Sequence, residues 1–124
     1  MHQLVKSVAL VVMIAVAQSA SANGCDKVER EDELQECLRA EFSKIDKELN
    51  AAYAKLRGEL NKEALVLLTK AQRLWVSLRD ADCELDAESY KGGSGYQAIY
   101  IQCQIDRTRQ RIKYFKSSRL WPRG

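Results

Sequence analysis

Apolar residues recur every three or four positions along three long stretches of this 124-residue chain. That spacing places them on one face of an α-helix, whereas a half-buried strand would alternate apolar and polar residues. The stretches cover approximately residues 27–60, 62–87 and 96–117, and no segment shows the alternation of a strand. The sequence therefore predicts an all-α fold, a small antiparallel bundle of about three helices.

Helix-breaking residues separate these stretches. Gly58 and Asn61 weaken helical structure and predict a turn where the chain reverses. Residues 88–95 contain three glycines within four positions and form the strongest loop signal after the first 22 residues. The tail, residues 118–124, contains Pro122 and is expected to be loosely held unless its tryptophan docks.

The first 22 residues have the features of a signal peptide. Lys6 gives a positive start, Val8–Ala17 is an unbroken apolar run, and small residues follow up to Ala22. The run is about half the length that a membrane-spanning helix needs, roughly 20 residues. Cleavage after Ala22 would leave residues 23–124 as one domain, periplasmic or secreted and without a transmembrane anchor.

Four cysteines follow the predicted cleavage point, and an oxidising compartment favours two disulfides. Of three possible connectivities, chain order favours Cys25–Cys37 and Cys83–Cys103, because each pair brackets a local segment. A straight helix would hold Cys25 and Cys37 about 18 Å apart. The chain before Cys37 is therefore expected to form a short helical turn that folds back. Lipidation of Cys25 is the alternative, although Asn23 fits a lipoprotein signal poorly.

The residue inventory argues against several kinds of chemistry. His2 is the only histidine and leaves with the predicted signal peptide, so no histidine base remains. Bridged cysteines supply no thiol nucleophile, and without histidines or a C-x-x-C pair no zinc site is expected. The carboxylates occur in mixed-charge helical runs, which are typical of solvated faces. We therefore expect a protein without catalytic activity, metal or cofactor.

Charge is small in total but unevenly distributed. The whole chain carries +3, and +2 remains without Lys6, which is too little to indicate nucleic-acid binding. Residues 25–50 contain nine acids and five bases, whereas residues 107–124 contain seven bases and no acid. In an antiparallel packing these two segments could lie side by side and neutralise each other. Otherwise they form an acidic or a basic contact surface.

A set of polar and cysteine residues follows helical spacing and then crosses the glycine loop. Gln72, Trp75, Arg79 and Cys83 lie three or four positions apart, and Cys103, Thr108 and Arg111 follow the Gly-Gly-Ser segment. This pattern resembles the LprI-type lysozyme-inhibitor family, a group of small secreted bacterial proteins. The first half of the family's pattern is matched by Cys25, Cys37, Asp46, Leu49, Asn50 and Tyr53.

The resemblance implies an all-helical fold with two disulfides and, for some members, inhibition of lysozyme. The polar motif residues lie on or beside apolar faces, which is typical of a hydrogen-bonded network that joins helices. Trp75 is interpreted as an anchor in the core. The predicted structural network comprises Asp46, Asn50, Tyr53, Gln72, Trp75, Arg79 and Arg111.

Two functional hypotheses follow. In the first, the protein binds and blocks a peptidoglycan-cleaving lysozyme, whose cleft contains two carboxylates. Its glycine loop would enter the cleft, or its acidic segment would steer the generally basic enzyme; the loop could also be a plain helix connection. In the second, the protein is a periplasmic binding or assembly module for envelope proteins or anionic polymers. The oligomeric state stays open. The loop residues assigned to partner binding are Tyr90, Lys91, Gly92, Gly93, Ser94 and Tyr96.

Overall fold

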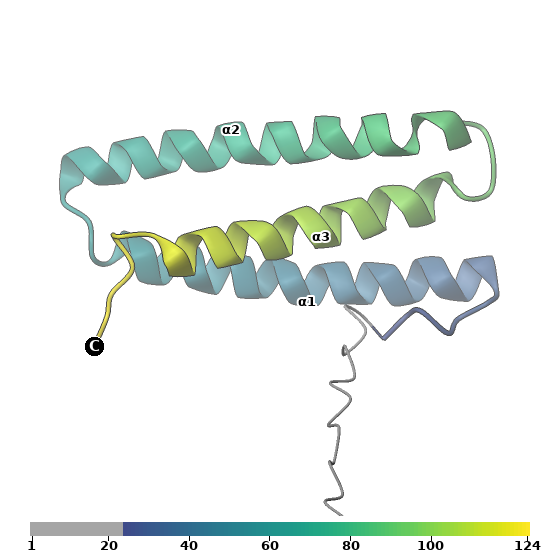
Figure 1. Cartoon of the computed structure of the whole chain (residues 1–124), viewed down its shortest axis with the longest axis horizontal. Coiled ribbons are helices and arrows are strands. Elements are labelled where there is room, and N and C mark those ends of the chain that lie inside the picture. Colours follow the sequence, from purple (N-terminus) through teal and green to yellow (C-terminus); the bar gives the residue numbers. More distant parts are fainter. Residues whose placement is uncertain (1–23) are drawn as a thin grey trace, which may run out of the picture.

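The computed structural model describes residues 24–124, so the predicted signal peptide lies outside the described residues. The elements are α1 (Glu31–Arg57), α2 (Lys62–Ala87), the short 3₁₀ helix η1 (Glu88–Tyr90) and α3 (Tyr96–Ser117) (Figure 1). The described part contains no strand, and the all-α prediction is confirmed. None of its helices is both long and apolar enough to cross a membrane.

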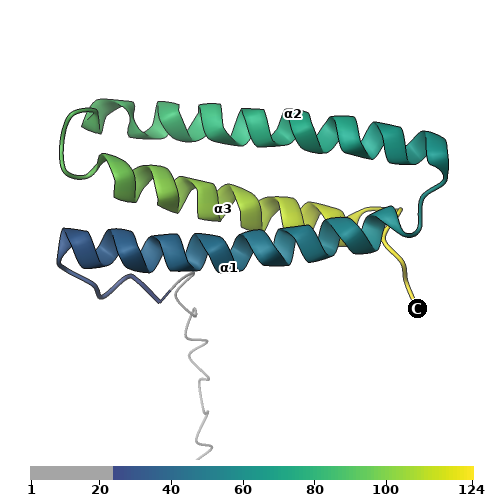
Figure 2. The same ribbon diagram turned by 180° about the vertical axis from the view of Figure 1, so that it is seen from behind.

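The three helices form an up-down-up arrangement in which α3 is the central element. α1 and α3 run in the same direction, and α2 runs in the opposite direction (Figures 1 and 2). α3 packs against both α1 and α2, whereas α1 and α2 contact each other little. Consequently α2 is covered on one side only.

The turn between α1 and α2 forms where the sequence predicts it. α1 ends at Arg57, and the backbone N–H of Gly58 donates to the carbonyl of Ala54. The side chain of Asn61 then caps α2 by accepting a hydrogen bond from the backbone N–H of Ala64 at 2.9 Å. The cap satisfies an N–H group that has no partner within the helix.

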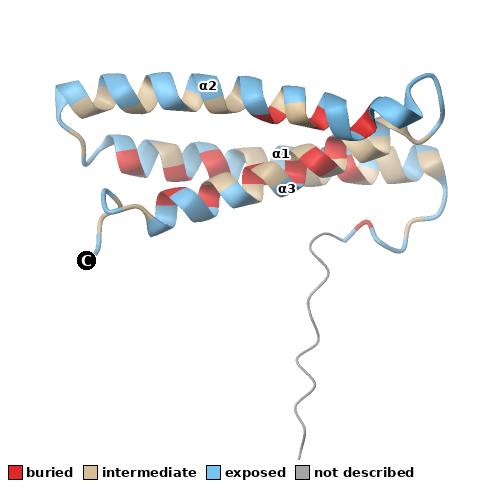
Figure 3. Ribbon diagram, turned by 45° about the horizontal axis from the view of Figure 1, so that its top comes forward, coloured by how far each residue is buried: buried red, intermediate tan, exposed pale blue. Residues whose placement is uncertain are grey.

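The hydrophobic core lies mainly between α1 and α3. Each helix contributes the side chains that helical periodicity places on one face, and these appear as a line of buried positions in Figure 3. α2 adds only three buried residues, Arg79, Cys83 and Ala87. The core residues of α1 and α3 are Leu38, Ile45, Leu49, Ala52, Leu56, Ile101, Ile105, Ile112 and Phe115.

Two disulfides staple the fold, with the pairing that chain order favours. Cys25–Cys37 has a Cα–Cα distance of 5.8 Å and Cys83–Cys103 one of 5.4 Å. No cysteine of residues 24–124 is free. The chain before Cys37 folds back through a turn in which Val28 N–H donates to the Cys25 carbonyl at 3.1 Å. α1 therefore begins at residue 31, four positions later than the periodicity suggests, because the disulfide requires this turn.

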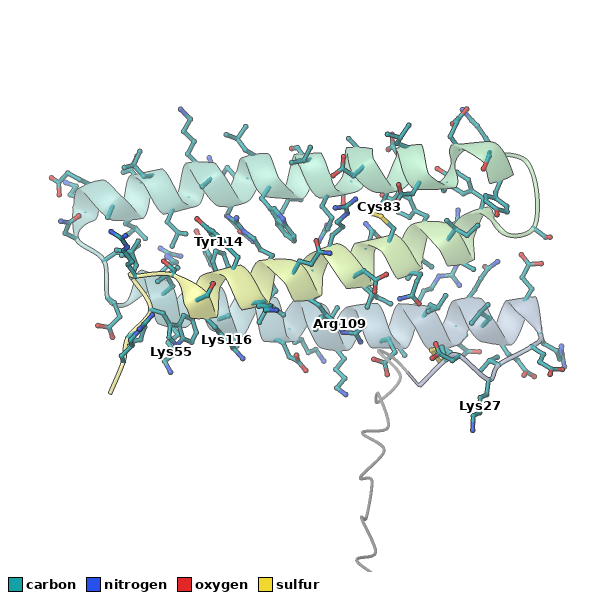
Figure 4. All side chains as sticks on the ribbon, viewed as in Figure 1. Lys27, Lys55, Cys83, Arg109, Tyr114 and Lys116 are labelled. Atoms are coloured by element: carbon teal, nitrogen blue, oxygen red, sulfur yellow. A yellow bond between two sulfur atoms is a disulfide. The ribbon has the colours of Figure 1, made fainter. Side chains whose placement is uncertain are left out.

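The C-terminal tail returns to the bundle through an aromatic side chain. Trp121 is partly buried against the core, beside the last turns of α1. The ammonium nitrogen of Lys55 lies 5.0 Å from the centre of the Trp121 ring, close enough for a cation–π contact. Figure 4 labels Lys55 and Lys116, which both line the shallow pocket beside this indole.

The acidic and basic segments neutralise each other only in part. Side-by-side pairing would need α1 and α3 to be antiparallel, but they are parallel, so the acidic start of α1 and the basic end of α3 lie at opposite ends (Figure 1). In the described residues one ion pair joins the two helices, Arg109 with Glu41 at 3.8 Å near mid-bundle (Figure 4). Net charge therefore differs between the two ends of the bundle, and the use of either end as a contact surface stays a prediction.

Candidate functional site

The glycine loop between α2 and α3 is an ordered turn at one end of the bundle. After η1, the backbone N–H of Lys91 donates to the Glu88 carbonyl at 3.1 Å, and that of Gly93 donates to the Tyr90 carbonyl at 2.9 Å. Gly92 has a φ of 79°, a left-handed conformation that glycine adopts without steric cost. These features fix the loop's backbone.

Aromatic side chains support the loop and leave its lysine exposed. A Cβ atom on Gly95 would lie 3.3 Å from the Tyr90 ring, so this glycine allows the tyrosine to pack closely. Tyr96 stacks on Tyr100 with ring centres 6.1 Å apart. Lys91 is exposed and has no ion pair within the described residues. The loop thus presents a free cation beside a half-exposed tyrosine.

Charge divides the bundle into two halves when each helix is cut at its midpoint. The half that contains the glycine loop, residues 24–44 and 75–106, carries thirteen acids and six bases. The other half, residues 45–74 and 107–124, carries four acids and thirteen bases. We call these the acidic half and the basic half. A small total charge therefore conceals a large local one.

The acidic half also contains an open, mostly apolar cavity of about 460 Å³. It lies beside both disulfides, between α1, α3 and the turn before α1. Three aspartates line it together with aliphatic side chains, a combination that suits a long side chain with a cationic end. The lining includes Asp26, Asp86 and Asp106 along with Val28, Leu34, Leu38, Ala98 and Ile99.

Arg79 is the centre of the motif residues. Only 8% of it is exposed, and its guanidinium lies 5.5 Å from the Phe42 ring centre and 5.2 Å from that of Trp75. It donates to a carboxylate oxygen of Asp80 at 2.9 Å and to the hydroxyl of Thr108 at 3.4 Å. One buried arginine therefore contacts all three helices.

A second arginine links α3 with α2. Arg111 donates to the side-chain oxygen of Gln72 at 3.0 Å. Its guanidinium also lies 5.4 Å from the Trp75 ring centre and 4.7 Å from that of Phe115. Burial lowers the pKa of Arg111 below its ordinary value, with a smaller opposing effect from Tyr114. Two arginine guanidiniums, those of Arg79 and Arg111, thus lie within cation–π distance of the Trp75 ring.

The remaining motif residues lie along the gap between α1 and α2. The Tyr53 and Thr69 hydroxyls are 3.4 Å apart and form a direct hydrogen bond between these helices. Asp46 and Asn50 have no hydrogen-bond partner among the described residues, and Asn50 is exposed. Both line a groove of about 600 Å³. Their assignment to a structural network stays a prediction.

Two contacts of the motif residues were not anticipated from the sequence. Phe42 follows the core periodicity of α1, yet its ring faces the guanidinium of Arg79. The Asp80 carboxylate accepts from Arg79 and also from Gln104 Nε2 at 3.1 Å, which ties it to α3. The adjacent Arg-Asp pair in the sequence was the available signal for Asp80.

Comparison with known families identifies the family to which the chain belongs. A sequence profile of the family described as lysozyme inhibitor LprI matches residues 22–115. The chain belongs to the LprI family. The match includes both disulfides, the glycine loop and every motif residue discussed above.

Two curated relatives are similar over most of their length. Uncharacterized protein R02472 of Rhizobium meliloti (strain 1021) is 30% identical over 105 residues, covering 74% of this chain and 76% of the relative. Uncharacterized protein YecT of Escherichia coli (strain K12) is 29% identical over 109 residues, covering 72% and 67%. No solved structure matches the chain significantly. The family name suggests lysozyme inhibition, while neither relative carries an assigned activity.

Proposed function

We propose that this LprI-family protein is a non-catalytic inhibitor of a peptidoglycan-cleaving lysozyme, acting in the periplasm or outside the cell. The observation that carries the proposal is the glycine loop, an ordered turn that presents unpaired Lys91 at the tip of the acidic half. The family match supports the target class. The loop residues would contact the enzyme directly, and the charge of the acidic half would attract and orient it.

Lys91 would act within the substrate cleft. Lysozyme clefts contain a pair of carboxylates, one of which is ionised during catalysis. The ammonium group would pair with the ionised carboxylate, and Tyr90 would cover part of the cleft wall. Because the loop is already ordered, binding loses little conformational entropy.

The acidic half would bring the two proteins together. A total charge near +2 gives no overall attraction to a basic enzyme, but the acidic half has seven more acids than bases. Such a local field speeds encounter and orients the partner. It would turn the loop end of the bundle, rather than the basic half, toward the enzyme.

The test is a turbidity assay of lysozyme activity on cell walls, with c-type, g-type and i-type enzymes and the oxidised domain. We expect Lys91→Ala and Tyr90→Ala to weaken inhibition strongly, a loss of about 2–5 kcal/mol for the lysine at a desolvated contact. Lys113→Ala, an exposed lysine in the basic half, is the matched control and should inhibit like the parent. Each variant must retain its helical circular dichroism.

Two results would refute this arrangement. The first is that the loop variants inhibit normally while a double charge reversal, Glu31→Lys with Glu33→Lys, abolishes inhibition. The acidic half, rather than the loop, would then be the surface that contacts the enzyme. If the parent inhibits no lysozyme type, the inhibitor proposal itself fails.

A second candidate function rests on the basic half. Its thirteen bases include seven in residues 107–124, a segment without any acid. This surface could bind anionic envelope polymers, as a non-catalytic binding module would. Binding to an anionic polysaccharide should then weaken steeply with salt, whereas a tight protein interface depends less on salt.

A further inference from the structure

The outward side of α2 carries a row of uncovered leucines. Four of them, at positions 67, 74, 78 and 85, are between 59% and 73% exposed. Figure 3 shows exposed residues along the length of α2. Isolated surface leucines are common, but a continuous row on one helix is typical of an interaction site. With the exposed alanines between them they form the leucine stripe: Leu67, Ala71, Leu74, Leu78, Ala81 and Leu85.

The spacing of the leucine stripe is that of a coiled coil. Its steps are four, three, four, three and four residues, which keep the side chains on one line as two helices wind around each other. The stripe is about 27 Å long, from the 18 residue steps between Leu67 and Leu85 at about 1.5 Å each. It therefore spans enough of α2 to pack against a second helix of similar length.

The stripe also reads the same in both directions. In an antiparallel pair of α2 helices related by a two-fold axis between Leu74 and Leu78, large residues meet large and small residues meet small. Leu67 would face Leu85 of the other copy, and Ala71 would face Ala81. A two-fold interface requires this kind of self-complementarity. Binding to a partner of unrelated sequence would not require the stripe to be self-complementary.

Charges beside the stripe favour the same arrangement. Lys70 and Glu84 flank it on one side, and both are exposed without an ion pair within the described residues. In the antiparallel pairing Lys70 of one copy lies opposite Glu84 of the other, twice per dimer. In a parallel pairing Lys70 would lie opposite the position of Trp75 instead. Flanking charges set helix orientation in coiled coils, and here they select the antiparallel one.

We propose that the protein forms a two-fold symmetric dimer through the leucine stripe of α2, with the helices antiparallel. The glycine loops then lie at opposite ends of the dimer, because α2 of each copy points toward its own loop. Each loop stays accessible in the dimer, and dimer formation does not itself require lysozyme inhibition.

The test is sedimentation equilibrium of the oxidised domain, from about 1 to 300 µM, a range suited to micromolar dissociation constants. The parent should be dimeric at the upper end. Leu74→Glu should be monomeric throughout. Val66→Glu is the matched control, since Val66 is 65% exposed on α2 but lies off the stripe, and it should dimerise like the parent.

Charge exchange provides the orientation test. Lys70→Glu places like charges together twice and should raise the dissociation constant about tenfold. Combining it with Glu84→Lys should restore the parent's value, provided circular dichroism shows that both variants fold. Failure of the double variant to recover would overturn the antiparallel pairing. A parent that stays monomeric, or that instead floats with anionic lipid vesicles, would overturn the dimer.

Discussion

Replacement of Arg79 tests whether the motif residues hold the three helices together. Its guanidinium lies between the rings of Phe42 and Trp75 and donates to the hydroxyl of Thr108, which is fully buried. Arg79→Ala removes these contacts at once. It also removes the aliphatic stem that packs beneath them.

The expected loss can be estimated contact by contact. Two cation–π contacts contribute about 1 kcal/mol each at a buried site. The hydrogen bond and the packing of the stem bring the sum to about 3 kcal/mol. For a domain of this size such a loss lowers the melting temperature by roughly 12–24 °C.

Thermal and urea unfolding, followed by circular dichroism with both disulfides intact, measures the change. Arg79→Lys keeps the charge but loses the planar group, so it should lose about half as much free energy. Arg57→Ala is the control, because Arg57 is exposed while its guanidinium also lies near a ring, 5.6 Å from Tyr53. If Arg79→Ala costs no more than Arg57→Ala, the structural interpretation of the motif is wrong.

Three further predictions concern processing, the core and pH. Mass spectrometry of the exported protein should show Asn23 as the first residue and a mass four hydrogens below that of the reduced chain; a lipidated Cys25 or a free thiol would contradict this. Trp75→Ala should lower the free energy of unfolding by about 3 kcal/mol, whereas an unchanged melting temperature with lost target binding would assign the indole to recognition. Burial, helped by two nearby carboxylates, raises the pKa of Tyr100 above its ordinary value near 10. The raised pKa contributes stability that is present below pH 10 and is lost as the pH rises above 10, so Tyr100→Phe should lose less stability than the parent as the pH is raised above about 10.

Helix positions were predictable because they depend on local patterns. The core positions of α3, such as Ile105 and Phe115, follow helical periodicity and are buried as expected. Gly58 and Asn61 mark the first reversal, and chain order favours the observed disulfide pairing. Each of these signals lies within a few residues of the feature it predicts.

Long-range arrangement was not predictable in the same way. The sequence does not show that α3 lies between the other two helices, so Leu78 could equally have belonged to the core face together with Arg79. The structure buries Arg79 and leaves Leu78 59% exposed. A hydrophobic residue at helical spacing shows that some partner surface is favourable, but not whether that surface belongs to the same chain. The contact between Phe42 and Arg79 and the groove beside Asn50 also depend on how the three helices pack against one another.

The division into acidic and basic halves makes the molecule a strong electric dipole. Opposite net charges occupy the two ends of helices that are each more than 30 Å long by a rise of about 1.5 Å per residue. Close to an anionic surface, within about 8 Å at physiological salt, such a dipole experiences a torque as well as a force. The basic half would turn toward a negatively charged cell envelope and the glycine loop would turn away from it. A monomer held this way presents Lys91 toward whatever approaches from the medium.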